Sequence, residues 1–74
     1  MQSPLENLMA RFSEYGIVSF TRDDNKFTLR INLYDTINRL HITTKLSNYF
    51  QSLNIPAIVA SDRKLVICNW EIRR

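Results

Sequence analysis

The chain has 74 residues, 45% of them hydrophobic and 23% charged, with ten basic and seven acidic side chains and a net charge of +3. These values indicate one folded domain over residues 1–74, and they exclude a second domain, a disordered chain and a membrane-spanning helix, which needs an apolar run of about 18 residues. One cysteine and one histidine exclude an internal disulfide and a four-ligand zinc site, so we expect so small a core to be reinforced by a homodimer or another partner.

The first predicted element is a helix over residues 4–15. Ser3 is placed to cap its first turn, and Pro4 suits the first helical position. Apolar residues recur along it at helical spacing: Leu5, Leu8, Met9 and Phe12. Gly16 follows the helix, and we expect it to adopt the left-handed conformation that commonly ends helices.

A β-hairpin is predicted next. Residues 17–22 are rich in β-branched and aromatic types, residues 23–26 have turn chemistry, and residues 27–34 alternate between apolar and polar. Residues 35–42 are compatible with either a helical turn or an extended connector.

The second half is predicted to repeat this order. A helix over residues 43–53 is followed by Asn54, the next most suitable residue for a left-handed cap. Strands over residues 55–60 and 65–72 follow, joined by a turn at residues 61–64. The last strand is apolar on both faces, which indicates that both faces are covered. We expect a second subunit or a partner on one of them, and predict as the interface Val66, Cys68, Trp70 and Ile72.

The two halves align without a gap at an offset of 38 residues, which pairs Leu8 with Leu46 and Phe12 with Phe50. This alignment predicts an internal repeat of residues 1–36 and 39–74, although two unrelated αββ units would also align roughly in this way. The predicted fold is therefore α+β: an αββ–αββ pseudo-repeat whose four antiparallel strands carry both helices on one face.

The αββαββ order is similar to the core of LAGLIDADG homing-endonuclease domains. Residues 8–16 resemble the family's helical motif in the leading leucine, the apolar Phe12 and the final glycine. The resemblance does not imply nuclease activity, because the motif's metal-binding acid falls on Tyr15 here and on Leu53 in the second half. Residues 5–33 also resemble the opening helix and hairpin of type III secretion chaperones. Neither resemblance includes residues that carry a family's function, so no family is assigned.

No pattern of residues indicates catalysis, a metal or a cofactor. One glycine cannot form a phosphate-binding loop, and the paired acids Asp23 and Asp24 lie on a predicted hairpin tip instead of in a cleft. Cys68 and His41 form the one conceivable nucleophile–base pair, but Cys68 lies among apolar strand residues, where cysteine acts as a small hydrophobe. We expect no enzyme. The absence of a visible secretory signal, together with the free cysteine, predicts a cytoplasmic location.

Basic residues concentrate on the predicted strands and turns. Only four of the seven acids lie there, but seven of the ten basic residues do. These seven are Arg22, Lys26, Arg30, Arg63, Lys64, Arg73 and Arg74. An open sheet face that combines cations, hydrogen-bonding groups and aromatic rings is typical of single-strand nucleic-acid binders. The residues predicted to bind nucleic acid are Arg22, Arg30, Asn32, Tyr34, Arg63 and Lys64.

Two functions therefore stand as hypotheses. The first is a small binding or regulatory module that binds nucleic acid through a basic sheet face. The second is a protein-interaction adaptor, inhibitor or assembly factor that acts through the apolar last strand around Trp70 and through dimerisation, since aromatic residues are enriched where partners bind.

Overall fold

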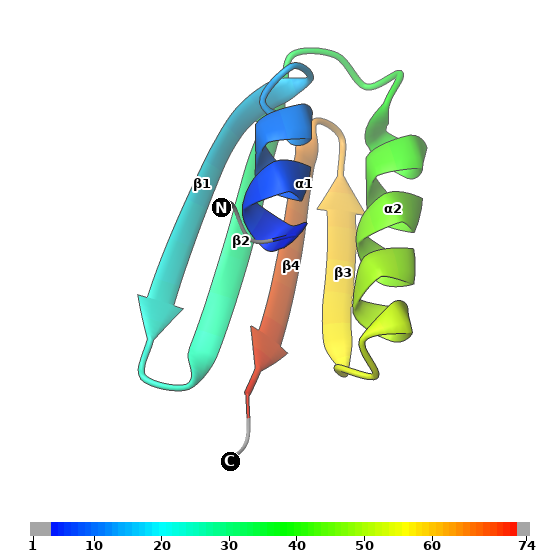
Figure 1. Cartoon of the computed structure of the whole chain (residues 1–74). Coiled ribbons are helices and arrows are strands. Elements are labelled where there is room, and N and C mark those ends of the chain that lie inside the picture. Colours follow the sequence, from blue (N-terminus) through cyan, green and yellow to red (C-terminus); the bar gives the residue numbers. More distant parts are fainter. Residues whose placement is uncertain (1–3, 73–74) are drawn as a thin grey trace.

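The computed structural model describes residues 4–72. Its elements follow the order α1 (Pro4–Phe12), β1 (Gly16–Asp23), β2 (Lys26–Leu33), α2 (Arg39–Ser52), β3 (Ala57–Asp62) and β4 (Leu65–Glu71). The strands form one antiparallel sheet in the order β1-β2-β4-β3, and both helices lie over the same face (Figure 1). The predicted α+β fold is confirmed. Neither α1 nor α2, the helices of the described residues, has the length and apolar character needed to cross a bilayer.

The helix α1 is shorter than predicted. It ends at Phe12 and continues as a tighter turn, in which the Glu14 amide donates to the Arg11 carbonyl (3.2 Å) and the Tyr15 amide to the Phe12 carbonyl (2.9 Å). This turn reverses the chain into β1 within three residues. The predicted cap, Ser3, lies outside the described residues.

The two residues expected to be left-handed behave differently. Asn54 has a φ of 56°, which confirms the prediction, whereas Gly16 does not have a positive φ. Gly16 is instead the first residue of β1, opposite Leu33. A Cβ at this position would overlap the carbonyl oxygen of Asn32 and lie 2.7 Å from the Cα of Leu33. The position needs glycine because two backbones approach closely, so the predicted reason was wrong.

The helix α2 begins at Arg39, four residues earlier than predicted, so most of the ambiguous connector is resolved as a turn and the first helical turn. The Asp35 carboxylate accepts a hydrogen bond from the Ile37 amide (3.2 Å), a local turn that brings the chain from β2 to the helix. Ile42, Leu46 and Phe50 follow at intervals of four residues and are all buried.

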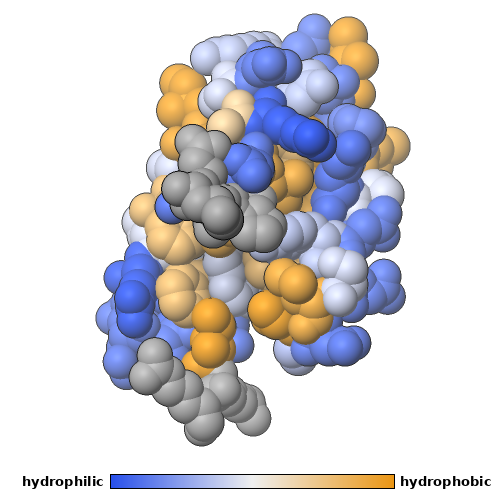
Figure 2. Space-filling model, viewed as in Figure 1, coloured by the Kyte–Doolittle hydropathy of each residue, from blue (hydrophilic) through white to orange (hydrophobic). Residues whose placement is uncertain are grey.

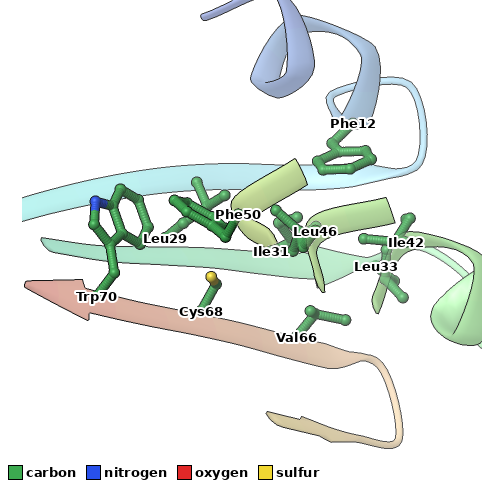
Figure 3. Packing of buried hydrophobic residues seen from close by; sticks show 10 residues of the cluster. All are labelled: Phe12, Leu29, Ile31, Leu33, Ile42, Leu46, Phe50, Val66, Cys68 and Trp70. Atoms are coloured by element: carbon green, nitrogen blue, oxygen red, sulfur yellow. The ribbon is translucent and has the colours of Figure 1, made fainter. Parts of the chain in front are cut away.

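The core lies between these helices and one face of the sheet, here called the helix face. Alternate strand residues point into it because successive side chains of a strand lie on opposite faces. Figure 3 shows the buried side chains of the strands meeting those of both helices. The buried hydrophobic residues are Phe12, Leu29, Ile31, Leu33, Ile42, Leu46, Phe50, Val66, Cys68 and Trp70.

The predicted internal repeat is not confirmed, and its offset is inconsistent with the strand pairing. The turn of the first hairpin, residues 24–25, corresponds in the second hairpin to residues 63–64, an offset of 39. The offset of 38 instead pairs Leu29, which is buried in the core, with Ile67, which points to the opposite face of the sheet. A shift of one residue exchanges the two faces of a strand, so the ungapped alignment fails in the hairpins.

Candidate functional site

The second face of the sheet, here called the open face, carries no covering element among residues 4–72 (Figure 1). The pairing register places its side chains in rows that cross the strands. From one end of the sheet to the other, the rows are Ile17, Asn32, Leu65 and Asp62; then Ser19, Arg30, Ile67 and Ala60; then Thr21, Thr28, Asn69 and Ile58; and finally Asp23, Lys26 and Glu71.

Apolar side chains, one cation and small polar side chains make up the open face away from its charged ends. Ile67 is half-buried between its cross-strand neighbours Arg30 and Ala60. Ile17 and Ile58 are 62% and 71% exposed, near opposite corners of the face. The hydroxyl of Thr28 donates to the side-chain oxygen of Asn69 (2.9 Å), which links the two central strands. The open face therefore combines exposed aliphatic surface with few charges away from its ends.

The charges of the open face do not make it basic. Two basic side chains, Lys26 and Arg30, stand against three acids, Asp23, Asp62 and Glu71. The excess positive charge predicted for the strands is therefore distributed elsewhere on the molecule, and Arg73 and Arg74 lie outside the described residues.

The six residues predicted to bind nucleic acid do not form one cluster. Arg30 and Asn32 lie on the open face. Arg22 lies on the helix face, with its guanidinium 5.4 Å from the centre of the Phe27 ring and its Nε donating to the Asp24 carbonyl (3.1 Å). The remaining three lie at the opposite end of the sheet from that hairpin tip, in or beside the connections: Tyr34, Arg63 and Lys64.

The aromatic side chains of the strands lie on the helix face. Trp70 stacks on Phe27 with a centroid distance of 5.5 Å and an interplanar angle of 9°, and it packs 4.5 Å from Phe50 of α2. Phe20 joins the same group, 6.0 Å from Trp70. These rings pack against one another on the helix face, so they are not available for stacking on the open face.

The predicted interface is therefore corrected. Val66 and Cys68 are fully buried and Trp70 is 6% exposed, all on the helix face, so these three side chains pack inside the monomer. Ile72 follows β4 and is partly exposed. The prediction that β4 is apolar on both faces was sound, but it assigned the interface to the face that the chain's own helices cover. The apolar residues of β4 on the open face are Leu65 and Ile67, both partly exposed.

The polarity of the side chains gives a partial indication of the buried face of β4. One face of β4 carries the apolar residues Cys68 and Trp70. On the other face, Leu65 and Ile67 are followed by the polar residues Asn69 and Glu71. A strand face that ends in Asn and Glu is more compatible with solvent than one that ends in Trp. Ile17 and Ile58 were missed because apolar and polar residues do not alternate strictly in either edge strand, so the pattern does not show which face is exposed.

Cys68 and His41 occupy different environments. His41, in the first turn of α2, lies edge-on to the Tyr15 ring with a centroid distance of 6.5 Å, whereas Cys68 lies in the centre of β4 within the core. Burial raises the pKa of the Cys68 thiol from 9.0 to about 11, so the thiol is protonated and unreactive near neutral pH. Among residues 4–72, no group of three His, Cys, Asp or Glu side chains could hold a metal ion.

We predict that Cys68 makes stability fall at alkaline pH. The unfolded chain releases the thiol proton near pH 9 and the folded chain only near pH 11. The contribution of the protonated thiol to the free energy of unfolding is therefore complete below pH 9 and is lost as the pH rises through 11. Urea unfolding should show a loss on the order of 2 kcal/mol between these values in wild type relative to Cys68→Ala. Parallel pH dependence of the two proteins would contradict this role.

An apolar groove of about 900 Å³ lies at the end of the sheet where β2 and β3 begin and β4 ends. Phe27 and Trp70 contribute to its wall together with the segment 54–58. Apolar side chains are visible at this end of the molecule in Figure 2. The groove is bordered by Lys26 and Glu71, a cation and an anion opposite each other across β2 and β4, so it has no single charge preference.

Comparison with known proteins identifies no relative: no family model matches the chain, and no curated protein or solved structure is significantly similar to it.

Proposed function

We propose that this domain is a protein-binding module and that the open face is its binding surface. The observation that carries the proposal is the group of aliphatic side chains on an uncovered sheet face around a single central cation, Arg30. Protein interfaces typically have this composition, with an apolar centre in which arginine is enriched and other charges are depleted, and a polar rim.

The exposed isoleucines supply the driving force. Ile17 and Ile58 each leave most of their side-chain surface in water, and burying an aliphatic side chain of this size contributes about 1.5–3 kcal/mol before the costs of association. Arg30 lies between them, where it can donate several hydrogen bonds to carbonyl or carboxylate oxygens of a partner.

The composition of the open face favours a protein over a nucleic acid. Nucleic-acid affinity comes mainly from phosphate contacts, and a face with two basic and three acidic side chains offers few of them. Sheet-face binders of single strands also stack bases on aromatic rings, and the described strands carry their rings on the helix face. Binding of nucleic acid remains the competing hypothesis that the experiment below must distinguish.

The test is site-specific photo-crosslinking in cells of the source organism. A photoreactive residue replacing Ile67 should give a discrete protein adduct, whereas the same residue at Asn48, exposed on α2, should not. Arg30→Glu should reduce the adduct at position 67 at least tenfold without changing the thermal unfolding midpoint. Equal labelling from positions 67 and 48, or no adduct from position 67, would contradict the proposal.

A parallel measurement addresses nucleic acid. Anisotropy of labelled single- and double-stranded oligonucleotides should show no binding at about 50 mM salt, where even weak phosphate contacts are detectable. Tight binding that weakens by orders of magnitude at about 200 mM salt and is abolished by Arg30→Glu would replace the protein-binding proposal with the nucleic-acid one.

A further inference from the structure

The sheet has two edges, and they differ in how well they are protected. β3 is short, follows Pro56, ends in Asp62 and packs against α2. β1 has eight residues, lies at the side of the sheet away from α2 (Figure 1) and contains no proline. Its residues 17–21 are uncharged, and two of them, Ile17 and Phe20, are exposed hydrophobic residues (62% and 39%). A long, uncharged edge of this kind is a template for another strand.

The hydrogen bonds of the sheet define which backbone groups of β1 are directed outward. The Leu33 amide donates to the Lys64 carbonyl (2.7 Å) and the Ile72 amide to the Asn25 carbonyl (3.0 Å), so odd-numbered residues of β2 bond to β4. Even-numbered residues of β2 therefore bond to β1, which directs the odd-numbered residues of β1 inward. The backbone groups of Gly16, Val18, Phe20 and Arg22 are left to point outward at the open edge.

We infer that a second copy of this chain pairs with β1, antiparallel, about a two-fold axis at Ser19. In this register Val18 faces the partner's Phe20 on the helix face, Ile17 faces the partner's Thr21 on the open face, and Arg22 faces the partner's Gly16. The edge is thus complementary to itself: apolar meets apolar in the core layer, and no like charges oppose each other. Moving the axis to Phe20 would place Val18 opposite a charged Arg22, which is less favourable.

The pairing has two consequences for the structure. Each outward residue exchanges two hydrogen bonds with the residue opposite it, which gives about eight new bonds across the dimer. The axis is perpendicular to the sheet, so four strands from each copy form one continuous sheet with all helices on one side and both open faces on the other. The dimer would present those faces side by side, but its formation does not depend on whether they bind a protein.

The edge itself is tested with a matched pair of proline substitutions. Val18 and Val59 are both partly buried on the helix face, and the same reasoning directs the amide of each away from the sheet, at β1 and β3 respectively. Light scattering should show wild type and Val59→Pro at twice the mass of the 8.8-kDa chain. Val18→Pro should have the mass of a single chain and an unchanged circular dichroism spectrum.

The register is tested by disulfide trapping, which remains decisive if Val18→Pro does not fold. Two Ser19 residues would form a non-hydrogen-bonded pair about 4.5 Å apart at their Cα atoms, within the range of a disulfide. Ser19→Cys should therefore form a covalent dimer on mild oxidation. Thr21→Cys should not, because the two positions would be about 14 Å apart along the strands. The native Cys68 is buried and does not compete.

A monomeric wild-type protein at all accessible concentrations would overturn the inference. So would a dimer that persists in folded Val18→Pro, or the failure of Ser19→Cys to crosslink. Dissociation by Val59→Pro with retention of the dimer in Val18→Pro would assign the interface to β3 instead.

Discussion

Trp70→Ala is expected to unfold most of the protein. Trp70 is 6% exposed and contacts Phe27, Phe50 and Phe20, so it joins β1, β2, β4 and α2 in one aromatic group. Truncation of a buried tryptophan to alanine typically costs about 3–5 kcal/mol. A core in a chain of this length rarely supplies more than about 3–5 kcal/mol in total. The loss is therefore comparable with the whole stability of the monomer.

The measurement is thermal and urea unfolding followed by circular dichroism, with Tyr34→Ala as the control. Tyr34 is 65% exposed, and its substitution should change the free energy of unfolding by less than about 0.5 kcal/mol. Trp70→Phe, which keeps an aromatic ring in the cluster, should recover part of the stability. A folded Trp70→Ala variant that only loses a partner would restore the prediction that Trp70 is an interface residue.

Gly16→Ala is expected to destabilise the fold by at least about 1–3 kcal/mol, the usual cost of overpacking. The added Cβ would overlap backbone atoms of Asn32 and Leu33, which are held in the β1–β2 and β2–β4 pairings. Relief would require separating β1 from β2 at the point where the chain leaves α1. Because a flexible side chain is not the obstacle, repacking cannot absorb the clash.

A second substitution separates this mechanism from the helix-cap mechanism. If Gly16 were needed for a left-handed conformation, asparagine would be tolerated better than alanine. Since Gly16 does not have a positive φ, Gly16→Asn should be at least as destabilising as Gly16→Ala. Urea unfolding of both variants, with Ser61→Ala as an exposed strand control, gives the comparison. Rescue by asparagine would contradict the close-approach explanation.

Local patterns predicted the elements and their order because each is specified within a few residues. The alternation of residues 27–34 predicted β2, and Leu8 and Phe12 on one helix face predicted α1. The early start of α2 was missed because the β-branched residues Ile42, Thr43 and Thr44 have low helix propensity, although Asn38, a favoured N-cap type, precedes the helix. The candidate site was predicted only in part: Arg30 and Asn32 lie on the open face, whereas Arg22 does not.

The sequence by itself determined the element order αββαββ and the amphipathic strand β2, because periodicity and turn chemistry act locally. Only the tertiary structure decided which face of β4 is buried, since Leu65 and Ile67 compete with Val66, Cys68 and Trp70 for the core. The tertiary structure also decided the strand order. Pairing β2 with β4 aligns Trp70 with Phe27 beneath α2, and the same pairing leaves β1 as the open edge. These are contacts between residues far apart in the chain, which no local pattern encodes.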